Sequence, residues 1–366
     1  MDSVTELLKR ETCATDSDYN GEYMGARISA VFVILVTSTL GALIPVISTK
    51  TSVSFLKMPS WLFFGAKYFG TGVIVATAFI HLLQPANENL SNDCLSATFR
   101  VYPWAFGIAL LSLFSLFFFE LLAFNYINKK LESTNGVPHS HSHFGELGKK
   151  ESDIEDEEEE HENSTPVVSA SKGLYPDHFS HAAEHQDPEN LDTPLQQMDK
   201  EQYYGQLVST IVLEFGIVFH SVFVGLTLAV SGDEFKTLYV VIVFHQTFEG
   251  LGLGTRIAGT RWPKGKEYLP YLFIIAYGLT TPIAIAIGLG VRQSYAPNSQ
   301  TALIVNGVFD SVSAGILIYT GIVELMAHEF LYSDQFKGPG SFKRMVAAYI
   351  VVVFGAGLMA LLGRWA

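Results

Sequence analysis

The residues of this sequence that could do chemistry lie inside long apolar runs. His245 and Glu249 are four residues apart in one such run, so an α-helix places both on one face. His220 and Ser221 lie in the middle of the preceding apolar run. A charged group at membrane depth costs about 3 kcal/mol or more, and a buried imidazole also needs a partner. We therefore expect the two segments to face each other and to hold a divalent cation inside a bilayer.

The mixture of donor atoms indicates which cation would fit. Two imidazoles, the Glu249 carboxylate and the amide oxygen of Gln246 suit Zn²⁺, Fe²⁺ or Mn²⁺. They suit Ca²⁺ poorly, because calcium takes oxygen ligands. A single histidine in an apolar run could equally be a hydrogen-bonded packing residue. The presence of His220, His245 and Glu249 in consecutive runs favours a metal site over that alternative.

Other polar residues in the apolar runs are candidates for the path of the ion. Asp310 is predicted near the outer entrance and Glu324 near the inner end of the same segment, on one stripe of helical steps. For the residues near segment ends, contact with water explains their polarity equally well. The path candidates are His81, Glu214, Asp310, Glu324, His328 and Glu329.

The composition of the chain is typical of an integral membrane protein. It has 366 residues, of which 49% are hydrophobic and 16% are charged, whereas soluble proteins carry about 25% charged residues. Its long apolar segments predict an all-α integral membrane protein with eight transmembrane helices. The predicted spans are 27–48, 61–83, 102–126, 206–230, 237–259, 268–290, 302–327 and 345–363. The predicted regions are an extracellular tail (1–26), helices one to three (27–126), a loop (127–205) and helices four to eight (206–363).

The loop between the third and fourth spans has a different composition. It contains an acidic run from Glu151 to Glu162 and too few apolar residues to bury a core, so we predict a disordered cytosolic loop. Histidines beside carboxylates could bind divalent metal weakly, and a solvated polar linker is the alternative. The candidate loop ligands are His139, His141, His143, His178, His181 and His185.

Positive charges predict the orientation of the chain. Lysine and arginine gather near the spans on one side, which is therefore predicted to be cytosolic, with both termini extracellular. A glycosylation sequon on the outer side favours the plasma membrane as the host membrane, and a vacuolar or endosomal membrane is the alternative. On the outer side, Asn89 begins a glycosylation sequon. Cys13 and Cys94 also fall there, where they could pair as a disulfide or remain free thiols. The loops predicted inside are 49–60, 127–205, 260–267 and 328–344.

Several other functional classes find no support in the sequence. The net charge of −13 comes largely from the acidic run in the loop, and no basic face for nucleic acid is visible. The stretch from His328 to Tyr332 begins like the His-Glu-x-x-His metalloprotease motif, but Tyr332 stands in place of the second histidine. No nucleotide-binding motif is present. We predict that the chain is not an enzyme and uses no organic cofactor.

Two motifs in consecutive spans together resemble the signature of the Zrt-/Irt-like (ZIP) divalent metal transporters. They are His220-Ser221-x-x-x-Gly225 and His245-Gln246-x-x-Glu249-Gly250. The stretches 72–81 and 313–324 are also similar to fungal and plant members of that family. Eight spans, external termini and a histidine-rich loop fit the same resemblance. Val224 stands near the place where bacterial members carry a further acidic residue, so the number of metal ions, one or two, stays open.

The resemblance implies import of zinc toward the cytosol, with iron or manganese as alternative substrates. It implies that the transport site consists of His220, Ser221, His245, Gln246 and Glu249. The expected partners are the lipid bilayer and the metal ion, with a homodimer and regulatory or ubiquitin machinery at the loop as further candidates. The competing interpretation is a membrane sensor or receptor that binds metal without moving it.

Overall fold

The computed structural model describes residues 13, 15, 17, 19–51, 57–135, 200–260, 262, 265–332, 334–337 and 340–365. All regular elements within these residues are helical, as the sequence predicted. The six histidines predicted as loop ligands lie outside the described residues.

Ten α-helices are present in the described part of the chain. They are α2 (Met24–Lys50), α3 (Ser60–Ala76), α4 (Gln84–Leu90), α5 (Ala97–Val101), α6 (Trp104–Asn135), α7 (Lys200–Val230), α8 (Phe235–Gly259), α9 (Leu269–Val291), α10 (Gln300–Tyr319) and α11 (Ser341–Leu362). Two π-helical segments and one 3₁₀ turn complete the described elements: η2 (Thr77–Leu83), η4 (Thr320–Tyr332) and η5 (Asp334–Phe336). Helix α3, η2 and α4 follow one another without a break, and η4 continues α10. Together with α2, α6, α7, α8, α9 and α11 they make eight long helical rods.

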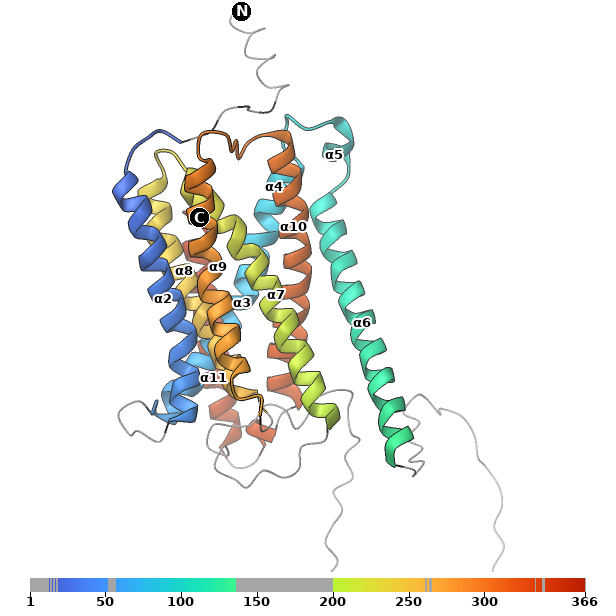
Figure 1. Ribbon diagram of the computed structural model, residues 1–366. Helices are drawn as coiled ribbons and strands as arrows, with labels where there is room; N and C mark the ends of the chain where they lie inside the picture. The colour runs from blue at the N-terminus through green and yellow to red at the C-terminus, as the bar shows by residue number, and fades with distance from the viewer. Residues whose placement is uncertain are drawn as a thin grey trace, which may run out of the picture.

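The rods lie side by side in one bundle (Figure 1). We call the end that carries α5 the α5 end, and the end at which α6 and α7 border residues 136–199 the loop end. Helices α6 and α7 reach further toward that segment than the predicted spans did, to Asn135 and from Lys200. The eight rods therefore correspond to the eight predicted spans, each extending past its predicted span at one end or both.

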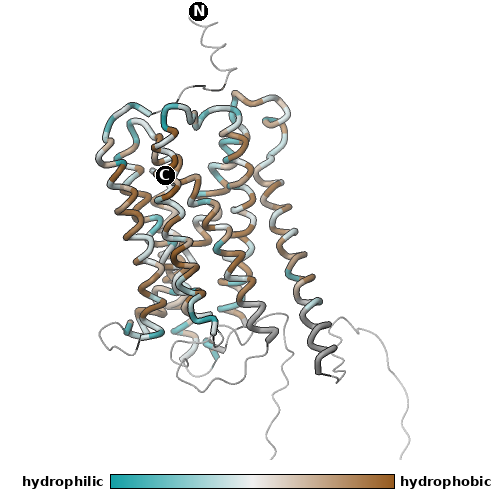
Figure 2. The backbone as a smooth tube through the Cα atoms, viewed as in Figure 1, coloured by the Kyte–Doolittle hydropathy of each residue, from teal (hydrophilic) through white to brown (hydrophobic). Residues whose placement is uncertain are grey.

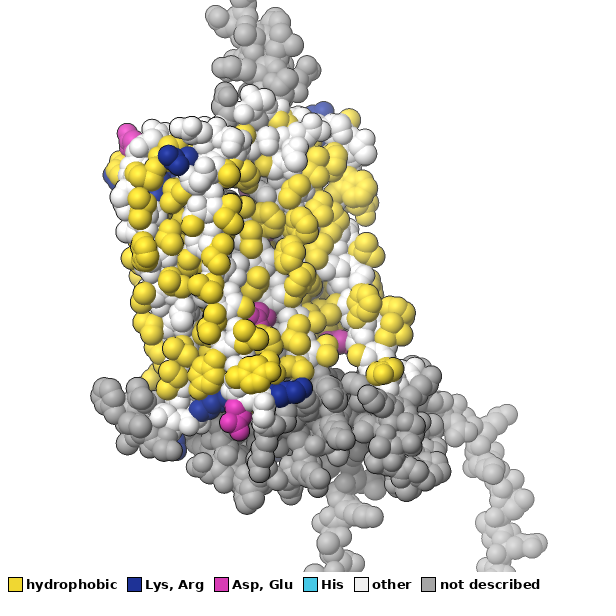
Figure 3. Space-filling model, in the orientation of Figure 1, with side chains coloured by type: hydrophobic (Ala, Val, Ile, Leu, Met, Phe, Trp, Pro, Cys, Tyr) yellow, Lys and Arg dark blue, Asp and Glu magenta, His cyan; other side chains and the backbone are white. Residues whose placement is uncertain are grey.

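Hydrophobic side chains cover the sides of the bundle, which is the surface that lipid requires. In the space-filling view they form a broad band on the visible face between its two ends (Figure 3), and the same rods appear largely brown in the hydropathy view (Figure 2). Phe32, Leu111 and Phe354 are examples of large apolar side chains that remain more than half exposed. The protein is therefore a multi-pass integral membrane protein.

Among the described residues, seven of the eight rods are apolar enough by composition alone to cross a membrane. The exception is α8, the predicted fifth span. Its polar residues, among them His245, Gln246 and Glu249, lower its hydropathy, but these side chains are buried inside the bundle. Helix α8 packs along α2 and α3, so neighbouring helices supply the environment that its own sequence lacks.

The remaining helix contacts divide the bundle into two groups, one made of α2, α7, α8 and α9 and the other of α3, α4, α6, α10 and α11. Helix α7 packs along α9, and α2 packs along both α8 and α9. On the other side, α10 packs along α6 and α4, and α3 packs along α11. The two groups meet where α7 contacts α10 and where α8 contacts α3.

A disulfide links Cys13 of the N-terminal segment to the α5 end of the bundle. Cys13 pairs with Cys94, which lies between α4 and α5, and their Cα atoms are 4.9 Å apart. Of the two alternatives left open by the sequence, the structure has the disulfide. Ser17 donates a hydrogen bond to the carbonyl oxygen of Arg292 at the end of α9, which fixes the N-terminal segment across the helix ends.

Candidate metal site

A buried cluster of three side chains that could bind a metal ion joins α7 to α8. The Nε2 atoms of His220 and His245 are 3.4 Å apart, and Nε2 of His245 is 3.4 Å from Oε1 of Glu249. One ligand atom from each of the three residues lies within 4.8 Å of the others. A tetrahedral Zn²⁺ with ligands at about 2.0–2.1 Å would hold two ligand atoms about 3.3 Å apart. Two of the separations in the cluster, both 3.4 Å, are therefore close to those of a zinc site.

The helix register places these residues at one depth. His220 is ten residues before the end of α7 at Val230, and His245 is ten residues after the start of α8 at Phe235. At about 1.5 Å per residue, both lie about 15 Å from the α5 end, near the middle of a hydrocarbon core of about 30 Å. The predicted facing of the two segments is confirmed by this geometry.

Several buried atoms in the cluster lack a hydrogen-bond partner among the described residues. Both carboxylate oxygens of Glu249 and Oε1 of Gln246 are in this state. Glu249 and Gln246 have no exposed surface, so water does not replace the missing partner. Unpaired polar atoms are expensive in such a place, and a bound cation would satisfy all of them.

Ser221 and Gln246 lie beside the cluster. Nε2 of Gln246 donates to Oγ of Ser221 at 3.4 Å, which leaves the amide oxygen of Gln246 available. The hydroxyl of Tyr277 on α9 donates to the backbone carbonyl of Gln246 and fixes this turn of α8. Tyr277 is fully buried, and sequence reasoning did not identify it.

The glycines of the two motifs serve helix packing. A Cβ on Gly225 would lie 2.7 Å from the carbonyl oxygen of Thr281 in α9, and a Cβ on Gly250 would lie 2.8 Å from that of Ser38 in α2. Any larger residue would push these helices apart. The glycines therefore set how closely α9 and α2 support the two helices that carry the cluster.

The structure brings two of the predicted path residues to the cluster. The ring of His81, in η2, packs edge-on against that of His245 with centroids 4.6 Å apart, and its Nε2 lies 2.9 Å from the carbonyl oxygen of Met359. His81 is buried, so contact with water does not explain it. Oδ1 of Asp310 is 3.8 Å from Nδ1 of His220. Asp310 was expected near the outer entrance, but it lies at the depth of the histidines.

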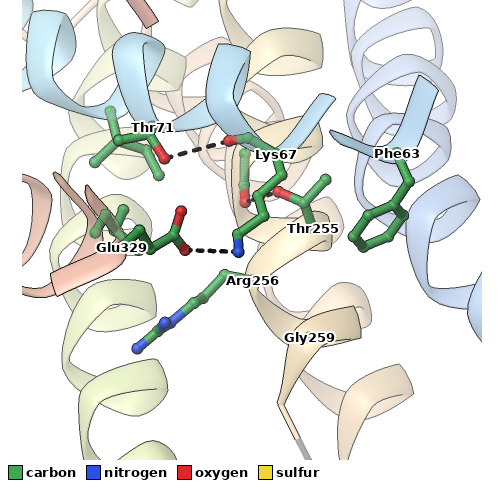
Figure 4. Close-up of a pocket in the computed structure, with 10 residues that line it drawn as sticks. Phe63, Lys67, Thr71, Thr255, Arg256, Gly259 and Glu329 are labelled. Carbon is green, nitrogen blue, oxygen red and sulfur yellow. Dashed lines mark hydrogen bonds and ion pairs between the residues drawn. The ribbon is translucent and has the colours of Figure 1, made fainter. Parts of the chain in front are cut away.

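Three other path residues lie at the loop end, where carboxylates pair with basic side chains. Nζ of Lys67 is 3.2 Å from Oε1 of Glu329, as Figure 4 shows. Nη2 of Arg256 is 3.7 Å from Oε2 of Glu324, and Ser209 donates to the same oxygen at 3.1 Å. The third, His328, is buried in η4. A cavity of about 20 Å³, room for about one water, lies between Lys67, Arg256 and Glu329.

Lys67 and Arg256 are functional candidates that sequence reasoning missed. Both lie inside predicted spans, at 61–83 and 237–259, and a cation there signals a buried partner. The last path residue, Glu214, is buried on α7 between the cluster and the loop end, and its Oε2 has no hydrogen-bond partner among the described residues.

Asn89, the predicted glycosylation site, is half-buried in α4 near the α5 end. Glycosylation of Asn89 stays a prediction.

Comparison with known proteins identifies the family. The family model described as ZIP Zinc transporter matches residues 24–363. The chain is 46% identical to "Zinc-regulated transporter 2" of Saccharomyces cerevisiae, with 99% of this chain and 100% of that protein covered. It is 38% identical to "Zinc-regulated transporter 1" of Schizosaccharomyces pombe over 97% of this chain and 89% of that protein. It is 34% identical to "Zinc transporter 8" of Oryza sativa subsp. japonica over 93% and 88%. The chain therefore belongs to the ZIP zinc transporter family.

Proposed function

We propose that this protein moves Zn²⁺ across the membrane into the cytosol, with His220, His245 and Glu249 as the central binding site. The observation that carries the proposal is a buried cluster in which Nε2 of His245 lies 3.4 Å from both Nε2 of His220 and Oε1 of Glu249, close to the spacing of zinc ligands. Ser221 and Gln246 complete the site, since the free amide oxygen of Gln246 faces no other donor among the described residues. The names of the fungal relatives support the same substrate.

The α5 end is the extracellular end in this proposal. The disulfide between Cys13 and Cys94 lies at that end, and disulfides persist in oxidising compartments. The sequon at Asn89 lies on the same side, and the lysines and arginines of the predicted inner loops lie on the other. In the proposed orientation both termini lie outside the cell, and the plasma membrane is the proposed host membrane.

A hydrated ion enters from the α5 end and exchanges water for the imidazoles and the carboxylate. It leaves toward the loop end, passing Glu214 before it reaches Glu324 and Glu329. Those two carboxylates are held by Arg256 and Lys67 in the structure described here, so this exit is closed. Helix groups must therefore shift relative to each other before the ion can leave, as alternating access requires.

The driving force is the ion's own gradient together with the membrane potential. No nucleotide-binding motif was found in the sequence. Moving a double positive charge inward gains about 4.6 kcal/mol per 100 mV, twice the per-charge value of about 2.3 kcal/mol. Histidines of the segment 136–199 then receive the ion on the cytosolic side.

Radiolabelled zinc uptake tests the proposal. Zinc-starved cells that express the full chain should accumulate zinc, and His245→Ala or Glu249→Ala should abolish uptake at equal surface abundance. Thr247→Val is the matched control, because the Thr247 hydroxyl bonds only to the carbonyl of Val243 in its own helix. Undiminished uptake by His245→Ala would refute the site.

Two further measurements separate the remaining alternatives. A sensor that binds metal without moving it would show no net accumulation of zinc above cells that lack the protein. Competition of labelled zinc by Fe²⁺ and Mn²⁺ measures whether these ions are also substrates.

Endoglycosidase should increase the gel mobility of the wild type but not of Asn89→Gln, which tests the orientation.

A further inference from the structure

The imidazole of His220 faces a different partner with each of its nitrogens. Nε2 lies 3.4 Å from Nε2 of His245, on the side of the metal cluster. Nδ1 lies 3.8 Å from Oδ1 of Asp310, which reaches it from α10. Asp310 is ten residues after the start of α10 at Gln300, so its depth in the bundle matches that of His220.

Neither atom of the contact between His220 and Asp310 has another polar partner in the described structure. Nδ1 of His220 and Oδ1 of Asp310 both lack a hydrogen-bond partner among the described residues. Both side chains are at least nine-tenths buried. At 3.8 Å the pair is just beyond hydrogen-bond distance, and a shift of less than 1 Å would bring it to about 3 Å.

The chemistry of metal-bound histidine gives this pair a role. A histidine that binds metal through one nitrogen commonly donates the N–H of the other to a carboxylate, which fixes the tautomer and the direction of the ring. With the proton on Nδ1 facing Asp310, the lone pair of Nε2 points at the cluster. His81 has the opposite arrangement, because its Nε2 faces the carbonyl oxygen of Met359.

The contact also crosses between the two helix groups. His220 is on α7, which packs along α9, whereas Asp310 is on α10, which packs along α6 and α4. A relative shift of the groups would separate Asp310 from His220 while both stay within their own groups. The orientation of His220 is therefore tied to the arrangement of helices that this structure has.

We propose that Asp310 is a positioning residue of the metal site, which orients His220 from the neighbouring helix group. This inference rests on the proposed function of the cluster and adds to it a residue that does not itself touch the ion. Because the carboxylate acts through His220, its effect should vanish when His220 is absent.

Metal binding to the purified full chain tests this role, with Co²⁺ as the probe because its visible absorption reports on its ligands. Asp310→Asn should weaken Co²⁺ binding by about 10–100-fold, the usual effect of losing such a partner. The absorption spectrum at saturation should stay that of the wild type, and Asp310→Glu should restore part of the affinity. Ser311→Ala is the matched control, because its hydroxyl bonds to Gly307 in its own helix.

A double-mutant cycle gives the decisive comparison. In a His220→Ala background, Asp310→Asn should cause no further loss of Co²⁺ affinity. In uptake assays, Asp310→Asn should raise KM for zinc and leave the maximal rate within about two-fold. Additive losses in the cycle, a changed Co²⁺ spectrum, or wild-type affinity of Asp310→Asn would each overturn the positioning role.

Failure of this inference is distinguishable from failure of the proposed function. If His245→Ala and Glu249→Ala bind Co²⁺ like the wild type, the cluster itself is not the metal site. If these two variants lose binding and Asp310→Asn does not, the cluster stands and only the role of Asp310 is refuted.

Discussion

The pairing of Lys67 with Glu329 at the loop end allows a quantitative prediction. The two charged atoms are 3.2 Å apart, and both side chains are largely buried, at 11% and 2% exposed. At an effective dielectric constant of about 20, their attraction is about 5 kcal/mol before the cost of desolvation. Removing one partner of such a pair leaves a buried charge and costs about 3–5 kcal/mol. We therefore expect Lys67→Met to lower the free energy of unfolding by about 3–5 kcal/mol.

The assay is equilibrium denaturation of the detergent-solubilised full chain by SDS, followed by tryptophan fluorescence. Lys57→Met is the control, because Lys57 lies at the same end and its side chain is exposed. The variant Lys67→Met/Glu329→Gln should recover about 2–3 kcal/mol relative to the sum of the single changes, the upper range for residues in contact. A coupling energy below about 0.5 kcal/mol would show that the pair is screened and that our account of the closed exit is wrong.

Three further predictions concern the site and the fold. Glu249→Gln should reduce zinc uptake by more than about 100-fold at equal surface abundance, since loss of an outer partner alone costs about 10–100-fold. Gly250→Ala should lower the free energy of unfolding by about 1–3 kcal/mol in the SDS assay, because its methyl group would meet backbone of α2, whereas Gly357→Ala has open space and should be neutral. Cys13→Ser should make Cys94 reactive toward maleimide without prior reduction, whereas the wild type should react only after reduction.

The centre of the site could be predicted from the sequence because its spacing is local. His245 and Glu249 are four residues apart, and any helix places them on one face. The partner His220 lies on another helix, and it was paired with His245 because polar groups in two consecutive apolar segments are costly in a membrane unless they share a cation. The structure confirms that these three side chains meet in one cluster.

The depth of Asp310 was within reach of sequence reasoning but was missed. His220, His245 and Asp310 each lie ten residues from the α5 end of their helices, so a comparison of registers would have placed them together. The prediction instead treated Asp310 as an entrance residue, because it is the first polar residue of a stripe on a helix that runs from outside to inside. It lies ten residues after the start of α10 at Gln300, which is about 15 Å deep.

The pairings at the loop end could not be read from helical periodicity, because the helix changes type there. A stripe of steps of three or four residues assumes 3.6 residues per turn, but from Thr320 onward the chain is π-helical, with hydrogen bonds from i to i+5. The wider turn rotates later residues away from the stripe that begins at Asp310. Glu324 consequently faces Arg256 on α8, and Glu329 faces Lys67 on α3. Each of the two carboxylates thus has its own cation on a different neighbouring helix, and in the proposed transport path opening the exit would require both helices to move relative to η4.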